Sequence, residues 1–155
     1  MKRSAGLLLW RRGTREIEVL LGHPGGPLFA HKDTWTIPKG EYDDSEPALC
    51  AAHREFAEEL GLAAPAGECV PLGEVTQNSG KRVTAWALEG DLDVSEVRSN
   101  SFQLQWPPRS GRWQEFPELD RAQWFGLAEA GSKLLPAQTP FLERLSTYLT
   151  GSGSR

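Results

Sequence analysis

The chain has 155 residues and a mass of 17.1 kDa, the usual size of one domain, which leaves little room for a second domain with a hydrophobic core of its own. Apolar residues make up 39% of it and include six Trp and six Phe, so large side chains for a core are present and global disorder is excluded. A net charge of −4 excludes an overall positive field for duplex nucleic acid or an anionic membrane surface. We predict one domain over residues 1–150 and a flexible tail over residues 151–155.

The N-terminal segment predicts a buried strand and not a secretory signal. Its positive residues precede an apolar run of about six residues, which is shorter than a signal sequence requires. We expect a strand over residues 4–10, a turn over 12–15 and a second strand over 16–22, paired as a hairpin. No segment reaches the ~18 apolar residues of a membrane helix, so we expect a soluble protein with no membrane partner.

The two cysteines are Cys50 and Cys69, and neither lies in a CxxC motif or at metal-site spacing from a histidine. A disulfide framework and a zinc site are therefore disfavoured. We expect two single buried thiols in a protein of the reducing cytoplasm.

The remaining elements alternate between helix and strand. A helix is expected over residues 46–60, capped by Ser45 or Asp44, with Pro47 in its first turn and Gly61 as its C-terminal stop. The later elements are strands over 68–77 and 82–89, a long loop over 91–115, a strand over 122–125, a helical turn over 127–134, and a helix over 139–149 capped by Thr139. This order predicts an α/β or α+β sandwich.

Three carboxylates lie on one face of the helix over 46–60. Glu55, Glu58 and Glu59 have spacings of three and four residues, which bring side chains onto one stripe. We expect the opposite side to be buried and small residues beside the stripe to leave room for a ligand. The residues of the buried side are Leu49, His53, Phe56 and Leu60, and those beside the stripe are Ala48, Ala51, Ala52 and Leu62.

The acidic stripe has two interpretations. Unpaired like charges at these spacings cost roughly 0.2–0.5 kcal/mol each, and a divalent cation would reverse that cost. Hard oxygen ligands favour Mg²⁺ or Mn²⁺ over zinc, and these ions commonly bind one or two carboxylates together with substrate phosphates. The alternative is a solvated acidic helix face with Arg54 as a surface partner.

The wider spacing resembles a known motif. Residues 40–62 read GEYDDSEPALCAAHREFAEELGL, in which Gly, five residues, Glu, seven residues and Arg-Glu-Phe-x-Glu-Glu-x-Gly-Leu match the Nudix box at each defining position. The chain is therefore identified as a member of the Nudix hydrolase family. The resemblance implies an α/β fold, a Nudix-type α/β/α sandwich with a mixed sheet.

The resemblance also implies roles for the residues of the box. Glu55, Glu58 and Glu59 are expected to bind Mg²⁺, with one of them acting as the base, and the choice among the three stays open. A backbone carbonyl at Lys39 or Gly40 is expected as a further ligand. Arg54 and Glu46 resemble the ion pair that orients the site in the family. Mn²⁺ is the alternative metal.

Candidates for substrate contact lie outside the box. Members of the family often recruit one more carboxylate from a later loop, and we favour Glu115 over Glu118 for this ligand. Positive and aromatic side chains are candidates for binding phosphates and a base. They are Lys39, Lys81, Arg109, Arg112, Trp113 and Trp106.

The run Trp35-Thr36-Ile37-Pro38-Lys39-Gly40 resembles the lead-in common in dinucleoside tetraphosphate and diphosphoinositol polyphosphate hydrolases. An inositol pyrophosphate needs a dense cluster of cations, which this acidic chain lacks, so nucleotides rank first. We expect a Mg²⁺-dependent pyrophosphohydrolase that acts on a small nucleoside polyphosphate or dinucleoside polyphosphate, as a monomer or homodimer. The alternatives are a hydrolase of damaged nucleoside triphosphates and a non-catalytic nucleotide-binding module.

Overall fold

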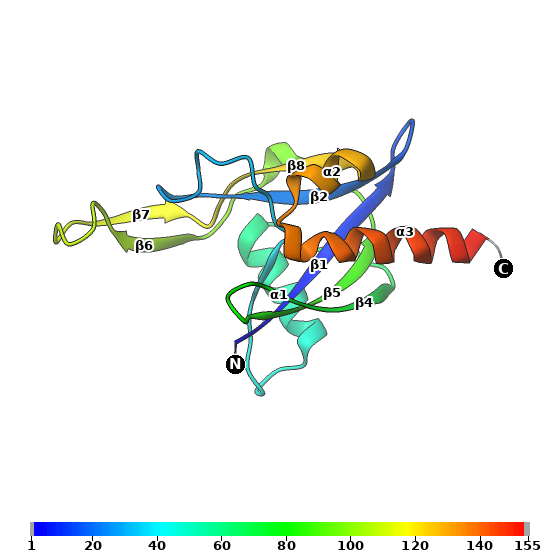
Figure 1. Cartoon of the computed structure of the whole chain (residues 1–155), viewed down its shortest axis with the longest axis horizontal. Coiled ribbons are helices and arrows are strands. Elements are labelled where there is room, and N and C mark those ends of the chain that lie inside the picture. The colour runs from blue at the N-terminus through cyan, green and yellow to red at the C-terminus, as the bar shows by residue number, and fades with distance from the viewer. Residues whose placement is uncertain (1, 154–155) are drawn as a thin grey trace.

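The computed structural model describes residues 2–153 (Figure 1). Its strands are β1 (Arg3–Arg12), β2 (Ile17–Pro24), β3 (Lys39–Glu41), β4 (Cys69–Thr76), β5 (Arg82–Glu89), β6 (Ser101–Gln105), β7 (Trp113–Pro117) and β8 (Leu119–Gly126). Its α-helices are α1 (Ala48–Leu60), α2 (Leu127–Lys133) and α3 (Thr139–Gly153), with single 3-10 turns at Val94–Glu96 and Pro136–Gln138.

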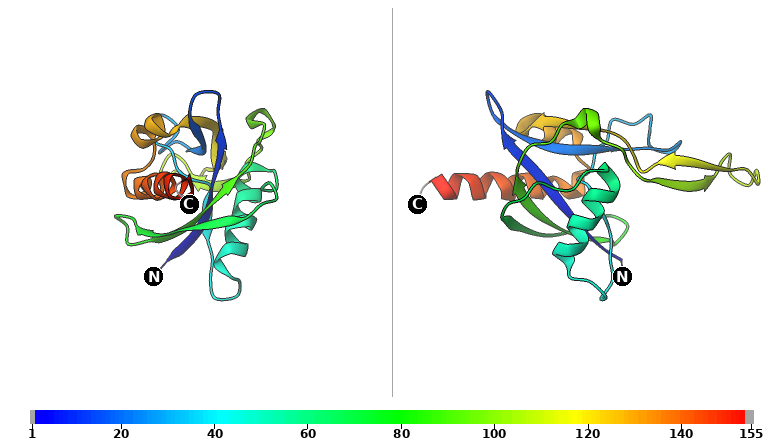
Figure 2. Two further views of the ribbon diagram at one scale, coloured as in Figure 1. Left: turned by 90° about the vertical axis from the view of Figure 1, so that its right-hand side faces the viewer. Right: turned by 180° about the vertical axis from the view of Figure 1, so that it is seen from behind.

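A mixed sheet forms the centre of the molecule. Its strand order is β4-β5-β1-β2-β8, and β3 pairs with β1 beside this path. The β1–β5 pair is parallel and the other pairs are antiparallel. Helix α1 covers one face, while α2 and α3 cover the other (Figure 2). The predicted α/β/α sandwich with a mixed sheet is confirmed.

Strand β1 separates two hydrophobic cores because successive side chains of a strand point to opposite faces. Leu7 and Leu9 pack with Phe56 of α1, whereas Leu8 and Trp10 pack with the residues of α2 and α3. Along one edge β1 changes its partner: Ser4–Gly6 pair with β3, and Trp10–Arg12 pair with β2. This change places the short strand β3 next to α1, where the Nudix box begins.

Pro47 and Gly61 mark the two ends of helix α1, and the predicted N-terminal side-chain cap is absent. Pro47 occupies the N-cap and no side chain caps the helix, because the Ser45 hydroxyl donates to Asp43 instead. At the other end Gly61 adopts the left-handed conformation with φ 72°, and its N–H donates to Ala57 O, as the predicted stop requires.

The buried face of α1 differs from the predicted one. Ala51 and Ala52 are fully buried against the sheet, whereas Leu49 and His53 are only half-buried. The small alanines therefore bring the helix close to β1 and do not open space for a ligand. Their burial also turns part of the acidic stripe inward, so the stripe does not face solvent as a whole.

Replacing Gly61 with Ala is expected to lower the free energy of unfolding by about 1–3 kcal/mol, the usual cost of a non-glycine residue in a strained backbone conformation. A Cβ at this position would also lie 2.3 Å from the carbonyl oxygen of Arg98. Urea denaturation measures the change. Gly131→Ala in α2 is the matched control, because its Cβ would meet open space; an equal loss in both variants would contradict this explanation.

Residues 101–117 form a hairpin, so the predicted long loop over 91–115 is wrong here. In β6, Phe102 and Leu104 alternate with polar residues, and Phe102 lies opposite Phe116 of β7 with ring centroids 6.0 Å apart. Pro107, Pro108 and Gly111 occupy the turn, and their presence concealed the strands on either side. The hairpin extends away from the central sheet (Figure 1).

The C-terminal prediction is also partly wrong. Helix α3 runs to Gly153, so it takes up the first three residues of the predicted tail, and residues 154–155 lie outside the described residues. The helix is stabilised because Phe141 and Leu145 pack into the core under the sheet. The other strands and helices agree with the predicted order, except that the short strand β3 was not predicted.

Both cysteines are free thiols, and they are less buried than expected. Cys50 lies on the exposed face of α1, and Cys69 is half-buried, with its Sγ 3.5 Å from Nε2 of His53. In the described part of the chain, no helix combines the length and the apolar character needed to cross a membrane.

Candidate active site

A cavity of about 320 Å³ lies where α1, β3 and the start of β1 meet. Carboxylates and lysines from separate parts of the chain line it together. They are Glu41, Glu55, Glu59, Glu118, Lys39 and Lys81, with Ser4, Gly40 and Asn100 completing the wall. We refer to this space as the acidic cavity.

Gly40 allows Glu55 of α1 to reach across β3. A Cβ built on Gly40 would lie 1.8 Å from Oε1 of Glu55 and 1.9 Å from its Cδ, so a residue with a side chain cannot coexist with this carboxylate position. The loop-to-strand glycine of the box is therefore required by a close approach. It places one carboxylate directly over the backbone of β3.

Glu59 and Lys39 form the inner part of the acidic cavity. The backbone N–H of Lys39 donates to Oε1 of Glu59 at 3.2 Å. Burial raises the pKa of Glu59, because removal from water disfavours the charged carboxylate. Burial also lowers the pKa of Lys39, and the neighbouring ammonium group of Lys81 lowers it further. Lys81 itself lies 3.3 Å from Oε2 of Glu41.

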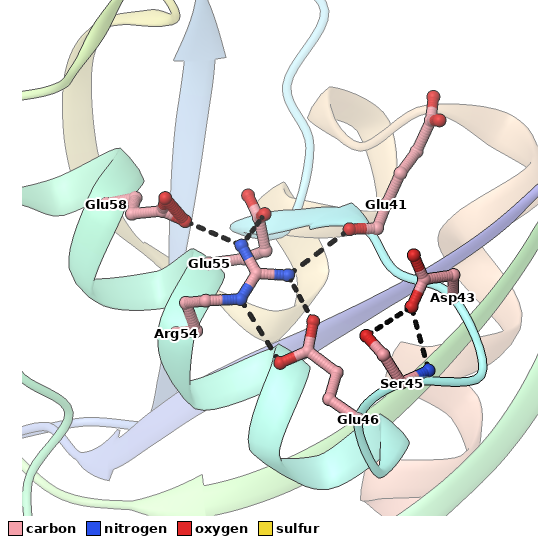
Figure 3. Close-up of polar contacts among 7 residues, drawn as sticks. All are labelled: Glu41, Asp43, Ser45, Glu46, Arg54, Glu55 and Glu58. Carbon is pink, nitrogen blue, oxygen red and sulfur yellow. Dashed lines mark hydrogen bonds and ion pairs between the residues drawn. The ribbon is translucent and has the colours of Figure 1, made fainter.

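Arg54 holds the outer carboxylates of the box in place (Figure 3). Its guanidinium donates to Glu46 at 2.5 and 3.2 Å, to Glu55 at 2.6 Å and to Glu58 at 2.8 Å. It also donates to the carbonyl oxygen of Glu41 at 3.3 Å. The hydrogen bonding of Arg54 to Glu46, in which the guanidinium donates, is the largest cause of the raised pKa of Arg54. The structure thus brings Arg54 and Glu46 together as the sequence predicted.

The three glutamates of the stripe have different surroundings. Glu55 and Glu59 line the acidic cavity, and the side chain of Glu55 is 16% exposed. Glu58 does not line it, and its side chain is 44% exposed while bound to Arg54. Two of the three predicted metal ligands therefore face the cavity directly, and the third lies outside it.

Glu118 is the later acidic residue that lines the cavity, whereas Glu115, which the sequence favoured, does not line it. Glu115 lies in β7 opposite Gln103, on the exposed hairpin. Glu118 follows the hairpin, where its backbone N–H donates to Asn100 O and its carbonyl oxygen accepts from Gly25. These two bonds fix the backbone at Glu118, which lines the acidic cavity.

The candidate substrate residues also divide into two groups. Lys39 and Lys81 line the acidic cavity as predicted. Arg109, Arg112 and Trp113 do not, because they belong to the tip of the β6–β7 hairpin, and Trp113 is 64% exposed. The half-buried Trp106 lies at the same tip and is likewise absent from the cavity wall.

Sequence reasoning missed Ser4, Glu41 and Asn100, and only β-strand register could have pointed to the first two. Ser4 pairs with Glu41 across the β1–β3 ladder. Among the described residues, the Ser4 hydroxyl is the one buried side-chain polar atom without a hydrogen-bond partner. A buried hydroxyl without a partner commonly marks a place that a ligand or water completes.

The donor set of the acidic cavity fits a hard divalent cation in its chemistry. Within the described part of the chain no three acidic, His or Cys side chains are already grouped as a metal site. However, Glu55, Glu59 and Glu118 line one cavity, and the charge of Glu118 adds to the raised pKa of both other carboxylates. Mg²⁺ prefers such carboxylate oxygens and would remove their repulsion.

Comparison with known proteins agrees with this architecture. The chain matches the family model described as NUDIX domain over residues 1–146. It is 40% identical over 114 residues to the 8-oxo-(d)GTP phosphatase of Mycolicibacterium smegmatis, which covers 68% of this chain and 34% of that protein. It is 26% identical over 110 residues to Nudix hydrolase 7 of Arabidopsis thaliana, which covers 68% of this chain and 38% of that protein. These matches span little more than a third of each relative's length.

Solved structures share the fold at lower identity. A Caenorhabditis elegans Ap4A hydrolase in a binary complex has a TM-score of 0.70 and 23% identity, covering 96% of this chain and 98% of that chain. The NUDIX domain of Shewanella oneidensis NrtR, complexed with ADP ribose, has a TM-score of 0.64 and 15% identity, covering 95% of this chain and 87% of that chain. With the family model matching residues 1–146 and Gly40, Glu55 and Glu59 of the box lining one cavity, the chain belongs to the Nudix family.

Proposed function

We propose that the protein is a Mg²⁺-dependent hydrolase that cleaves a phosphoanhydride bond of a nucleoside polyphosphate by attack of water on phosphorus. The observation that carries this proposal is the acidic cavity, where four glutamates and two lysines line one space. We also infer that residues 1–150 act as one domain, since both hydrophobic cores are built on one sheet.

The carboxylates would hold the metal, and the lysines would bind the phosphates. Glu55, Glu59 and Glu118 are the proposed metal ligands, because these three residues line the cavity. The bound metal would neutralise phosphate charge and lower the pKa of water. The side chains of Lys39 and Lys81 would each bind a phosphate oxygen as a point charge. Lys81 exchanges its contact with Glu41 for the substrate in this scheme.

Proton transfer needs a carboxylate that is held in position and keeps acceptor capacity beside the metal, since a carboxylate has about four lone-pair sites. Glu55 suits this role, since Arg54 donates to its Oε2 while its Oε1 lies over Gly40. Glu46 fixes Arg54, and Arg54 fixes Glu55 and Glu58, so these contacts orient the site without touching the reacting atoms. A carboxylate within reach of the water can accept its proton as the bond to phosphorus forms.

Two narrower substrates have specific support. The relative from M. smegmatis is an 8-oxo-(d)GTP phosphatase, which supports a damaged nucleoside triphosphate. The similar solved structure from C. elegans is an Ap4A hydrolase, which supports a dinucleoside polyphosphate. A third possibility is a module that binds a nucleotide without cleaving it, and the intact set of carboxylates argues against it.

Metal removal is expected to abolish turnover, and added Mg²⁺ is expected to restore it, because the carboxylates alone cannot neutralise a polyphosphate. The purified protein is incubated with dinucleoside polyphosphates, normal and oxidised nucleoside triphosphates, ADP-ribose and inositol pyrophosphates, each with Mg²⁺ and with a chelator. Mass spectrometry identifies the products. Nucleotide binding without cleavage would overturn the hydrolase and favour the binding module, and cleavage that persists with the chelator would overturn the metal dependence.

A further inference from the structure

A second cavity adjoins the acidic cavity and shares three residues with it. It has a volume of about 340 Å³, within the ~300–1,000 Å³ usual for small-molecule sites. Lys39, Glu59 and Glu118 line both spaces. These shared residues place the two spaces side by side, and we name the second one the side cavity.

The side cavity has a wall of different chemistry. Phe29, Leu119, Leu135 and Pro24 contribute apolar surface, and Thr34 and Thr36 contribute hydroxyl groups. Aromatic and aliphatic faces bind a flat, weakly polar ring better than a phosphate, since an anion on an apolar wall loses hydration without gaining a partner. A nucleobase combines such a ring face with polar edges.

Phe29 lies on a loop whose backbone is held in place. The N–H groups of Ala30 and Lys32 donate to Gly26 O and Phe29 O at 2.9 Å each. The fully buried His23 donates through Nε2 to the carbonyl oxygen of Lys32 at 2.5 Å. The Phe29 ring nevertheless remains 48% exposed, with the ammonium of Lys32 5.3 Å from its centroid. A fixed loop thus presents an exposed aromatic ring at the side cavity.

We propose that the side cavity binds one nucleobase of the substrate, with the Phe29 ring stacked on it. This inference rests on the proposed function, because the shared residues Lys39, Glu59 and Glu118 place the phosphates in the acidic cavity. The phosphate chain enters past these residues, and the base lies against Phe29 and Leu135. The site selects a nucleotide over a polyphosphate that lacks a base.

The test compares two neighbouring residues with similar exposure. Leu28 is 50% exposed and does not line the side cavity, so Leu28→Ala controls for loss of an exposed apolar side chain on the same loop. Phe29→Ala is expected to weaken the binding of AMP and GMP, measured by calorimetry, by about tenfold, the size expected for loss of one stacking contact. Inorganic tripolyphosphate, which has no base, is expected to bind Phe29→Ala and the wild type equally.

Each outcome decides the inference separately from the proposed function. Equal nucleotide binding by the wild type, Phe29→Ala and Leu28→Ala would overturn the stacking contact, and so would failure of the wild type to bind AMP or GMP. Phe29→Tyr keeps an aromatic ring at this position and is expected to bind AMP and GMP as the wild type does. If the loop needed Phe29 itself to keep its structure, Phe29→Tyr would bind them as weakly as Phe29→Ala. Absence of metal-dependent cleavage of any nucleotide overturns the proposed hydrolase, whereas the calorimetry still reports on the side cavity.

Discussion

Replacing Glu118 with Gln is expected to lower kcat about 10²–10³-fold, whereas Glu115→Gln is expected to leave it within about twofold. A loss of about 10²–10³-fold in kcat is typical when one preorganised group that stabilises transition-state charge is removed. Glu118 lines the acidic cavity with Glu55 and Glu59, and its charge contributes to the raised pKa of both. Glu115 is exposed on β7. Steady-state kinetics at saturating Mg²⁺ measure the difference.

The Glu118→Gln substitution removes the charge of the side chain and leaves the backbone hydrogen bonds of this residue intact. Its backbone N–H and carbonyl oxygen, and not its side chain, bond to Asn100 and Gly25. Glutamine has nearly the same shape, so thermal unfolding of both variants should match that of the wild type. A variant Glu118→Gln that keeps full activity, or a greater loss at Glu115, would show that the later carboxylate does not act from this cavity.

The choice between Glu115 and Glu118 shows what the sequence could not supply. Both residues precede the predicted strand at 122–125, and the long-loop interpretation gave no reason for either to face the helix. Their separation by three residues matters only once β7 is known to end at Pro117. Glu115 then points out from a two-stranded hairpin, while Glu118 lies past its end beside the central sheet.

The hairpin itself could have been predicted from alternation. Ser-Phe-Gln-Leu-Gln over residues 101–105 has the period of a half-buried strand, and the Pro-rich segment after it is a turn. The hydrophobic face pairs Phe102 with Phe116, a contact between residues fourteen positions apart in sequence. Local composition favoured a loop, and the cross-strand contact decided the structure.

The Nudix box residues were predicted more completely because their geometry is local. A helix fixes the positions of Glu55 and Glu59 through its own period, and Arg54 reaches Glu46 from the same loop and helix. The role of Ala51 and Ala52 was not local. They face the sheet, so their small size sets the distance between α1 and β1, which no pattern within the helix reveals.

Replacing Gly40 with Ala is expected to lower kcat/KM about a hundredfold while changing the free energy of unfolding by less than about 1 kcal/mol. The new Cβ would lie 1.8 Å from Oε1 of Glu55, so the carboxylate must move away from β3. A displacement of about 1 Å in a catalytic group can cost a hundredfold in rate. The displaced atoms lie at the end of a flexible side chain, and an off-rotamer position of that side chain costs about 0.5–1.5 kcal/mol. Ala in place of Gly in a strand gains about 0.5–1 kcal/mol, which partly offsets this cost. The free energy of unfolding is therefore expected to change little.

The neighbouring glycine on β1 provides the contrast. Gly6 pairs with Lys39 in the same ladder, but a Cβ there would lie 2.5 Å from the carbonyl oxygen of Pro38, which is backbone and cannot turn aside. Gly6→Ala is therefore expected to lower the unfolding temperature clearly, whereas Gly40→Ala is expected to lose activity with a near-normal unfolding temperature. Kinetics and thermal unfolding on both variants separate the two effects. If Gly40→Ala unfolds as early as Gly6→Ala, the glycine of the box serves the backbone of β3 and not the position of Glu55.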